Sequence, residues 1–240
     1  MTILVLGASG ATGRLLVAQL LESGNAVKAV VRAQSRVLDV FSDRAALSLV
    51  RANIGDLADE EIVQLVDGCN AIVSCLGHTL SFRGIYGQPR RLVTDATRKL
   101  CRAVKQHKSD TPVKFILMNT TGNSNRDIPE RISFGQTCVI GLLRLLLPPH
   151  VDNEKAADVL RTEIGQNDSR VEWVVVRPDG LTDEVEVTEY SVHPSPIRSA
   201  IFDAGSTSRI NVANFMARLI TEQKIWDKWK GQMPVIYNAE

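Results

Sequence analysis

The sequence of 240 residues lacks an excess of either charge sign, because lysine and arginine total 28 and aspartate and glutamate total 27. A protein that binds nucleic acid or a membrane surface through its overall field needs a basic excess, so neither partner is expected. A long apolar run is also lacking. The most apolar later stretch, residues 138–147, is too short to span a bilayer and contains Arg144. Since no apolar leader precedes the first strand-like run, we expect a cytoplasmic protein.

Cysteine is scarce, and the four residues form no Cys-x-x-Cys pair: Cys69, Cys75, Cys101 and Cys138. No histidine cluster with zinc-ligand spacing accompanies them, which argues against a metal site. We expect reduced and mostly buried thiols. The hydrophobic content of 44% supports a full core. The length fits a single large α/β domain over residues 1–240.

The chain opens on a short apolar run, residues 2–6, followed at once by a glycine-punctuated stretch. Leucines then recur at helical spacing, so this region predicts a strand, a tight turn and a helix. In such a junction one glycine permits the turn, one lets the backbone approach a pyrophosphate, and one lets the helix pack on the strand. Free N–H groups at the helix N-terminus favour an anion. The predicted dinucleotide site comprises Gly7, Ser9, Gly10, Ala11, Thr12 and Gly13.

Glycine-rich turns also occur for structural reasons, and the spacing Gly-x-x-Gly-x-x-Gly differs from the commoner Gly-x-Gly-x-x-Gly. The support comes from the later alternation of strands and helices, which predicts an α/β fold: a Rossmann-type, doubly wound, mostly parallel sheet. The expected strands cover residues 26–31, 47–51, 69–76, 112–118 and 171–176, and the expected helices cover 59–66, 90–107, 131–147 and 152–166. Residues 78–87 are expected to form a loop.

Beyond Leu181 the alternation weakens, and we expect a small C-terminal substrate-side lobe over residues 181–240. Its expected elements are short strands at residues 185–190, 208–210 and 234–237 and a helix at 212–222.

The second strand ends without an acidic residue. In Rossmann domains an acid at this point accepts from the ribose of NAD, whereas an arginine accommodates the 2′-phosphate of NADP. Arg32 and Arg36 follow the strand here, which favours NADP(H) over NAD(H). A solvated basic turn is the alternative. Asp56, after the third strand, is expected near the adenine or at a helix cap.

Strands one and four should flank the point where the strand order reverses. The residues expected to border the cofactor crevice there are Ser74, Cys75, Leu76 and Gly77. The fifth strand is followed by Asn119, Thr120 and Thr121, at the sheet edge where ligands of open α/β folds bind. Chemistry is expected at this edge, although an ordinary polar turn also uses such residues.

Six stretches, taken in order, resemble the atypical short-chain dehydrogenase/reductase superfamily, and within it the NAD(P)H-binding, NmrA-like and flavin-reductase-like branch: residues 7–14, 30–32, 53–56, 73–77, 177–180 and 208–213. The resemblance covers nearly the whole chain and implies the fold, dinucleotide binding, and cofactor contacts from Pro178 and Lys155.

Enzymes of the wider superfamily use a Tyr-x-x-x-Lys pair, in which the tyrosine exchanges the proton that accompanies hydride transfer. Lys155 occupies a place that matches the lysine, but Val151 stands at the tyrosine position. A valine cannot exchange a proton, which argues against alcohol dehydrogenase chemistry by the usual tyrosine. Lys155 is interpreted either as a ribose ligand or as a surface lysine. Loop histidines, among them His78, are alternative proton donors, although a lone loop histidine is usually solvated.

Two functions fit these features. The first is a reductase that binds NADPH and passes a hydride to a small-molecule acceptor such as a flavin, a quinone or a carbonyl compound. Its candidate catalytic residues are Thr120, Thr121 and Lys155. The second is a non-catalytic NADP(H)-sensing regulatory protein that acts through a protein partner. The apolar segment 137–147 suits a contact with a partner or a second copy, or else a core helix.

Overall fold

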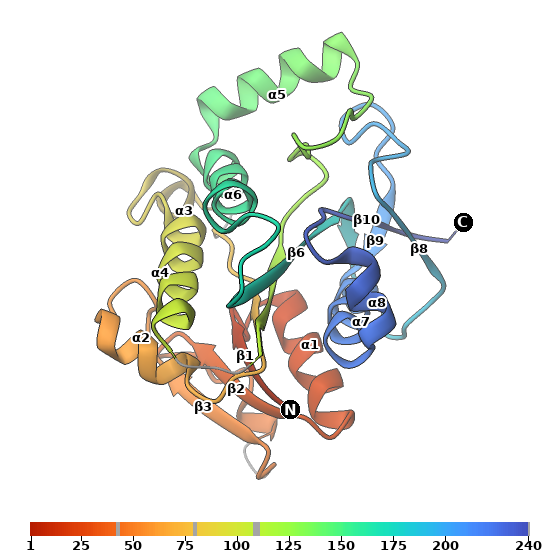
Figure 1. Ribbon diagram of the computed structural model, residues 1–240. Helices are drawn as coiled ribbons and strands as arrows, with labels where there is room; N and C mark the ends of the chain where they lie inside the picture. Colours follow the sequence, from red (N-terminus) through yellow and green to blue (C-terminus); the bar gives the residue numbers. More distant parts are fainter. Residues whose placement is uncertain (42–43, 79–80, 108–110, 240) are drawn as a thin grey trace.

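The computed structural model describes residues 1–41, 44–78, 81–107 and 111–239 (Figure 1). Its main sheet has eight strands in the order β3-β2-β1-β4-β5-β6-β10-β8. All neighbouring strands run parallel except β8, which pairs antiparallel with β10. The strands are β1 (Thr2–Leu6), β2 (Ala26–Val31), β3 (Leu47–Arg51), β4 (Ala71–Ser74), β5 (Val113–Met118), β6 (Val171–Pro178), β8 (Tyr190–His193) and β10 (Val235–Asn238). This arrangement confirms the predicted Rossmann-type, mostly parallel sheet.

Helices cover both faces of the sheet, with one set packed beside α1 and the other beside α4 (Figure 1). The first set comprises α1 (Ala11–Glu22), α7 (Arg209–Thr221) and α8 (Gln223–Trp229); the second comprises α2 (Asp59–Val66), α4 (Leu92–Gln106) and α6 (Pro148–Asp158), which continues as a π-helix over Val159–Ile164. Alternate residues of β1 enter the two cores: Ile3 packs in the first and Leu4 in the second. A strand buried on both faces explains why β1 reads as a continuous apolar run.

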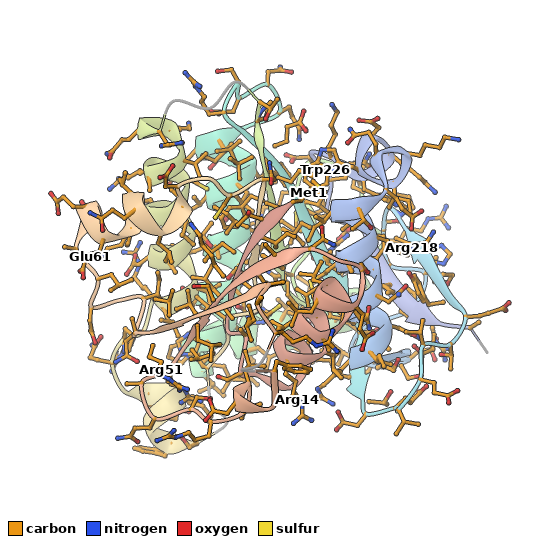
Figure 2. All side chains as sticks on the ribbon, turned by 90° about the horizontal axis from the view of Figure 1, so that it is seen from below. Met1, Arg14, Arg51, Glu61, Arg218 and Trp226 are labelled. Atoms are coloured by element: carbon orange, nitrogen blue, oxygen red, sulfur yellow. The ribbon has the colours of Figure 1, made fainter. Side chains whose placement is uncertain are left out.

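Glu61 on α2 lies at the periphery, while Trp226 of α8 is fully buried (Figure 2). Glu61 accepts from the backbone N–H of Ala58 and closes the N-terminus of α2. Trp226 donates from Nε1 to Glu172 at 2.6 Å, so its polar atom is satisfied inside the core.

Several predicted elements were wrong in kind or extent. The expected loop at 78–87 contains α3 (Phe82–Tyr86), and residues 185–189 form no strand. Ser208 ends the short strand β9 (Ser206–Ser208), which pairs with β7 (Gly180–Thr182), and its side chain then accepts from the N–H of Asn211 as the cap of α7. A hydroxyl that caps the next helix therefore ended the predicted strand early.

The segment after Leu181 contributes β8 and β10 to the main sheet, and α7 packs on α1. Its substrate-side role stays a prediction. None of the helices in the described ranges is long and apolar enough to cross a membrane.

The helix α5 (Phe134–Leu146) lies at the edge of the molecule, away from the main sheet (Figure 1). Only Gln136 and Ile140 within it are buried, whereas Phe134 is 86% exposed and Leu145 is 79% exposed. Burial of this helix in the core is therefore wrong, and its apolar outer face is open. The helix is attached to α6 by Arg144, which donates to both carboxylate oxygens of Glu154.

The stability of the protein should depend on pH through the carboxyl of Glu154. Burial raises the pKa of its carboxyl, but the contacts with His150 and Arg144 outweigh burial and lower the pKa to about 2. A carboxyl whose pKa is lowered by folding stabilises the fold when the pH lies above its ordinary pKa. This stabilisation is lost as the pH falls toward 2. We expect Glu154→Gln to lower the free energy of unfolding at pH 7 and to flatten its decline between about pH 5 and 2. Urea unfolding across this pH range measures it; a parallel decline in both proteins would contradict this origin.

Candidate functional site

The turn after β1 brings the chain against the end of β4 at Gly7. This glycine has φ +67°, and a Cβ there would lie 2.4 Å from the carbonyl oxygen of Cys75. At Gly13 a Cβ would lie 2.2 Å from the carbonyl oxygen of Gly7, so the helix packs directly on the turn. Both positions therefore require glycine, one for the turn and one for helix packing, as the spacing predicted.

The N-terminus of α1 follows this turn and suits an anion. Its N-cap is Gly10, which has no side chain to satisfy the first N–H groups of the helix, and the first turn contains no acidic residue. The open N–H groups and the positive end of the helix dipole therefore face the glycine turn. A diphosphate is a fitting ligand for this cradle.

A cleft of about 620 Å³ opens beside this cradle, at the carboxyl ends of β1 to β4. Eight of the predicted cofactor residues line it: Gly7, Ser9, Gly10, Arg32, Asp56, Cys75, Leu76 and Gly77. Other lining residues were not among the predicted cofactor residues: Asn53, Ile54 and Gly55 after β3, and Ser81, Gly84, Gln88, Pro89 and Leu92 around α3, together with His78, which was expected only as an alternative proton donor. The stretch 53–56 contributes to the family resemblance, so a signal for the first three existed. The contribution of α3 had no signal because a loop was expected there.

The remaining predicted cofactor residues lie outside the cleft lining. Ala11 is exposed, Thr12 and Gly13 are buried, and Ser74 is fully buried in β4. Arg36 lies 3.5 Å from Asp39 in an ion pair, and its side chain is 85% exposed. Asn119, Thr120, Lys155 and Pro178 belong to the sheet edge farther along. Their contacts with a cofactor stay predictions.

Polar side chains at the ends of β5 and β6 are hydrogen-bonded mainly to one another. Asn119 donates from Nδ2 to the carbonyl of Asn153 at 2.8 Å. Thr121 is buried and donates from Oγ1 to Asp179 at 3.1 Å. Thr120 is half-buried, and its Oγ1 accepts from the N–H of Gly122 at 3.3 Å. Of the two threonines, Thr120 is therefore the more accessible to a ligand.

Lys155 is exposed on α6, and within the described ranges its side chain has no hydrogen bond or ion pair. Its position leaves both the ribose-ligand and the surface-lysine interpretations open. The two tyrosines near the loops are hydrogen-bonded elsewhere in the described structure. Tyr86 donates its hydroxyl to the carbonyl of Leu146, and Tyr190 donates to Asn214.

The expectation of a solvated loop histidine is wrong for His78. Its side chain is 7% exposed, and its ring reaches Asp152 at 2.8 Å and the carbonyl of Gly84 at 3.2 Å. Cys75 in the same cleft is a neutral thiol, because burial raises its pKa to about 12. No group of three or more potential metal ligands occurs in the part of the chain that the structure describes.

Arg177 at the end of β6 is a fully buried cation. It donates to the carbonyl oxygens of Met233 and Asn123 at 2.7 and 2.9 Å, and to Glu130 at 2.6 Å. These bonds connect β6 to the loop that follows β5 and to the segment before β10. Arg177 therefore supports the sheet edge at which chemistry was expected.

Residues 7–223 match the NAD(P)H-binding family. An uncharacterized chloroplastic protein of Arabidopsis thaliana is 24% identical over 222 residues, which are 92% of this chain and 72% of that protein. A short-chain dehydrogenase/reductase of Veillonella parvula in complex with NADP has 15% identity and a TM-score of 0.68, over 99% of this chain and 94% of that one. ChuY, an anaerobillin reductase of Escherichia coli O157:H7, has 15% identity and a TM-score of 0.69, over 100% and 98%.

At these identities the two solved structures show a common fold, which agrees with the strand order found here. The family match, by contrast, extends from the glycine turn through α7. We conclude that this chain belongs to the NAD(P)H-binding family.

Proposed function

We propose that the protein is an NADPH-dependent reductase that transfers a hydride to a small carbonyl compound, a quinone or a flavin. The observation that carries this proposal is the cleft beside an uncapped helix N-terminus, at the topological switch point of the sheet. NADPH supplies the hydride when bound, and the chain has to orient the acceptor and exclude water. The similar fold of a protein named as a reductase supports the same reading.

The preference for NADPH rests on Arg32. This arginine lines the cleft just after β2, and no described carboxylate pairs with it. No acidic residue follows β2 at the point where NAD-binding domains place one. A guanidinium without a partner suits the 2′-phosphate. A structural relative that holds NADP supports this assignment.

Arg32→Glu is expected to weaken NADPH binding by about 30-fold and to leave NADH binding within about threefold, since it reverses the charge opposite the 2′-phosphate. Fluorescence titration with each cofactor measures both affinities. Arg36→Glu serves as the matched variant, and we expect a smaller loss because Arg36 is exposed and paired with Asp39. An equal loss of affinity for NADPH and NADH in Arg32→Glu would contradict the assignment of Arg32 to the 2′-phosphate.

The reductase function itself is tested by NADPH oxidation with a panel of aldehydes, quinones and flavins. At least one class should accelerate NADPH consumption well above background. Tight NADPH binding without acceleration by any acceptor would overturn the proposal.

The second candidate is the NADP(H)-sensing regulatory protein that acts through a partner or a second copy. The observation that favours it is the outer face of α5, where Phe134, Cys138, Leu142 and Leu145 recur at helical spacing and are exposed. This function requires the stoichiometry of the protein, measured by light scattering, to differ between its free and NADPH-bound forms.

A further inference from the structure

We propose that His78, positioned by Asp152, donates the proton that accompanies hydride transfer, and that the acceptor atom receiving it is a carbonyl oxygen. This inference rests on the proposed reductase function and assigns the role that the missing tyrosine leaves vacant. It rests on the contacts of two side chains that are 74 residues apart in the sequence.

Both ring nitrogens of His78 face hydrogen-bond acceptors. Nε2 lies 2.8 Å from Oδ2 of Asp152, and Nδ1 lies 3.2 Å from the carbonyl oxygen of Gly84. A neutral imidazole carries only one N–H and can make only one of these bonds as a donor. Both bonds together require the imidazolium, which is an acid. A ring that carries both protons can therefore make both bonds at once.

Asp152 is suited to hold this form. It is 1% exposed, and its carboxylate accepts from the N–H groups of Val93 and Thr94 at 2.8 and 3.0 Å. These donors belong to the first turn of α4, whose dipole favours a negative charge. With three donors around it, the carboxylate acts purely as an acceptor. Its place on α6 is fixed further by Thr94, which donates from Oγ1 to the Asp152 carbonyl at 2.9 Å.

His78 also occupies the right end of the cleft. It comes after β4 and residues 75–77 and lines the same cleft as Gly77, whereas Arg32 and Asp56 line it beyond β2 and β3. In a Rossmann domain the ends of β2 and β3 serve the adenosine, and the end of β4 lies on the path to the nicotinamide. Cys75 also lines the cleft near this end, but its thiol is too weak an acid because burial raises its pKa to about 12.

Other charged groups on the surrounding elements are engaged elsewhere. Glu154 of α6 pairs with Arg144, and Arg90, between α3 and α4, donates to the carbonyl of Tyr86. Lys155 is exposed. Within the described ranges, Asp152 is therefore the charged side chain in contact with His78.

The proton from Nδ1 is the one that can be transferred. Its partner, Gly84, belongs to the five-residue helix α3 at the cleft, and this bond is the longer of the two. In the proposed step the carbonyl π bond breaks, the hydride from NADPH forms a C–H bond, and the Nδ1 proton forms the O–H bond. NADP⁺, an alcohol and a neutral imidazole remain, and water returns the proton. A carbonyl oxygen needs such an acid because an alkoxide is too basic to form unprotonated in neutral water.

The test compares His78→Gln with the wild type in NADPH oxidation by 4-nitrobenzaldehyde and phenanthrenequinone. Glutamine can still donate to Asp152 but carries no acidic proton. We expect turnover to fall about 100-fold, while the NADPH dissociation constant changes less than about threefold. His107→Gln is the matched control: His107 also pairs with an aspartate, Asp67 at 3.1 Å, but lies after α4 at the opposite edge of the sheet. Its turnover should equal that of the wild type.

A second measurement does not depend on activity. Nitrogen-15 NMR of the histidine rings should show a hydrogen bond from Nε2 of His78 to a carboxylate, and Asp152→Asn should shift this signal. A His78 ring without this hydrogen bond, or full turnover by His78→Gln, would overturn the proton-donor role alone. Failure of every acceptor with the wild type would instead overturn the proposed reductase function, and the donor role with it.

Discussion

Arg177→Met is expected to lower the free energy of unfolding by about 3–5 kcal/mol, because it leaves a buried charge without its partner. Glu130, 3% exposed in its side chain, would lose the guanidinium that lies 2.6 Å away. The carbonyl oxygens of Met233 and Asn123 would lose their donors as well. Methionine fills part of the volume, so the loss reports mainly on the polar contacts. Urea denaturation followed by tryptophan fluorescence measures it.

Two further variants serve as controls for Arg177→Met. Arg91→Met removes an exposed cation 3.6 Å from Asp95 on α4, and a surface pair of this kind should cost less than about 1 kcal/mol. The double variant Arg177→Met with Glu130→Met should be more stable than Arg177→Met alone, since it removes the orphaned carboxylate. A loss below about 1 kcal/mol in Arg177→Met would show that the pair contributes little.

Gly7→Ala is expected to weaken NADPH binding by about 100-fold or more, because distorting the turn that would bind the phosphates costs about 3 kcal/mol. The added Cβ would meet the Cys75 carbonyl oxygen at 2.4 Å, and the φ of +67° is one that alanine rarely adopts. Relief requires the turn to move away from β4, which shifts the N-terminus of α1. Isothermal titration with NADPH measures the affinity, and thermal unfolding measures the accompanying loss of stability.

Gly24→Ala provides the matched control. Gly24 has φ +75°, close to that of Gly7, but a Cβ there meets nothing within 4 Å. It should therefore share the backbone strain of about 1 kcal/mol and leave NADPH affinity unchanged. If both variants lose affinity equally, contact with the end of β4 is not what shapes the phosphate turn.

Local sequence pattern was sufficient for the first half of the sheet. The bounds of β1, β2, β3 and α2 agree with the predicted ranges, because each apolar run is closed by glycine or polar residues within a few positions. The fourth strand was predicted too long, since Cys75 and Leu76 continue the apolar run but leave the sheet to line the cleft. Apolar composition alone does not distinguish a strand from a segment that lines a cleft.

The contacts that organise the candidate site were beyond such reasoning. His78 meets Asp152 across 74 positions, and Arg177 meets Glu130 across 47. No sequence spacing predicts either contact, because both depend on which loops the strand order of the sheet brings together. The family resemblance supplied the cofactor class. It could not place α5, because the same apolar helical pattern occurs in a core helix and in a helix whose apolar face is exposed.

The position of β10 has a consequence for how the chain is made. This strand, residues 235–238, lies between β6 and β8. During synthesis β6 therefore exposes an unpaired edge, and β8 has no partner in the sheet, until residues 235–238 have left the ribosome. Unpaired strand edges are the usual sites of wrong association between chains. The nascent protein is accordingly vulnerable to aggregation before residues 235–238 emerge, and deleting these residues would make that vulnerable state permanent.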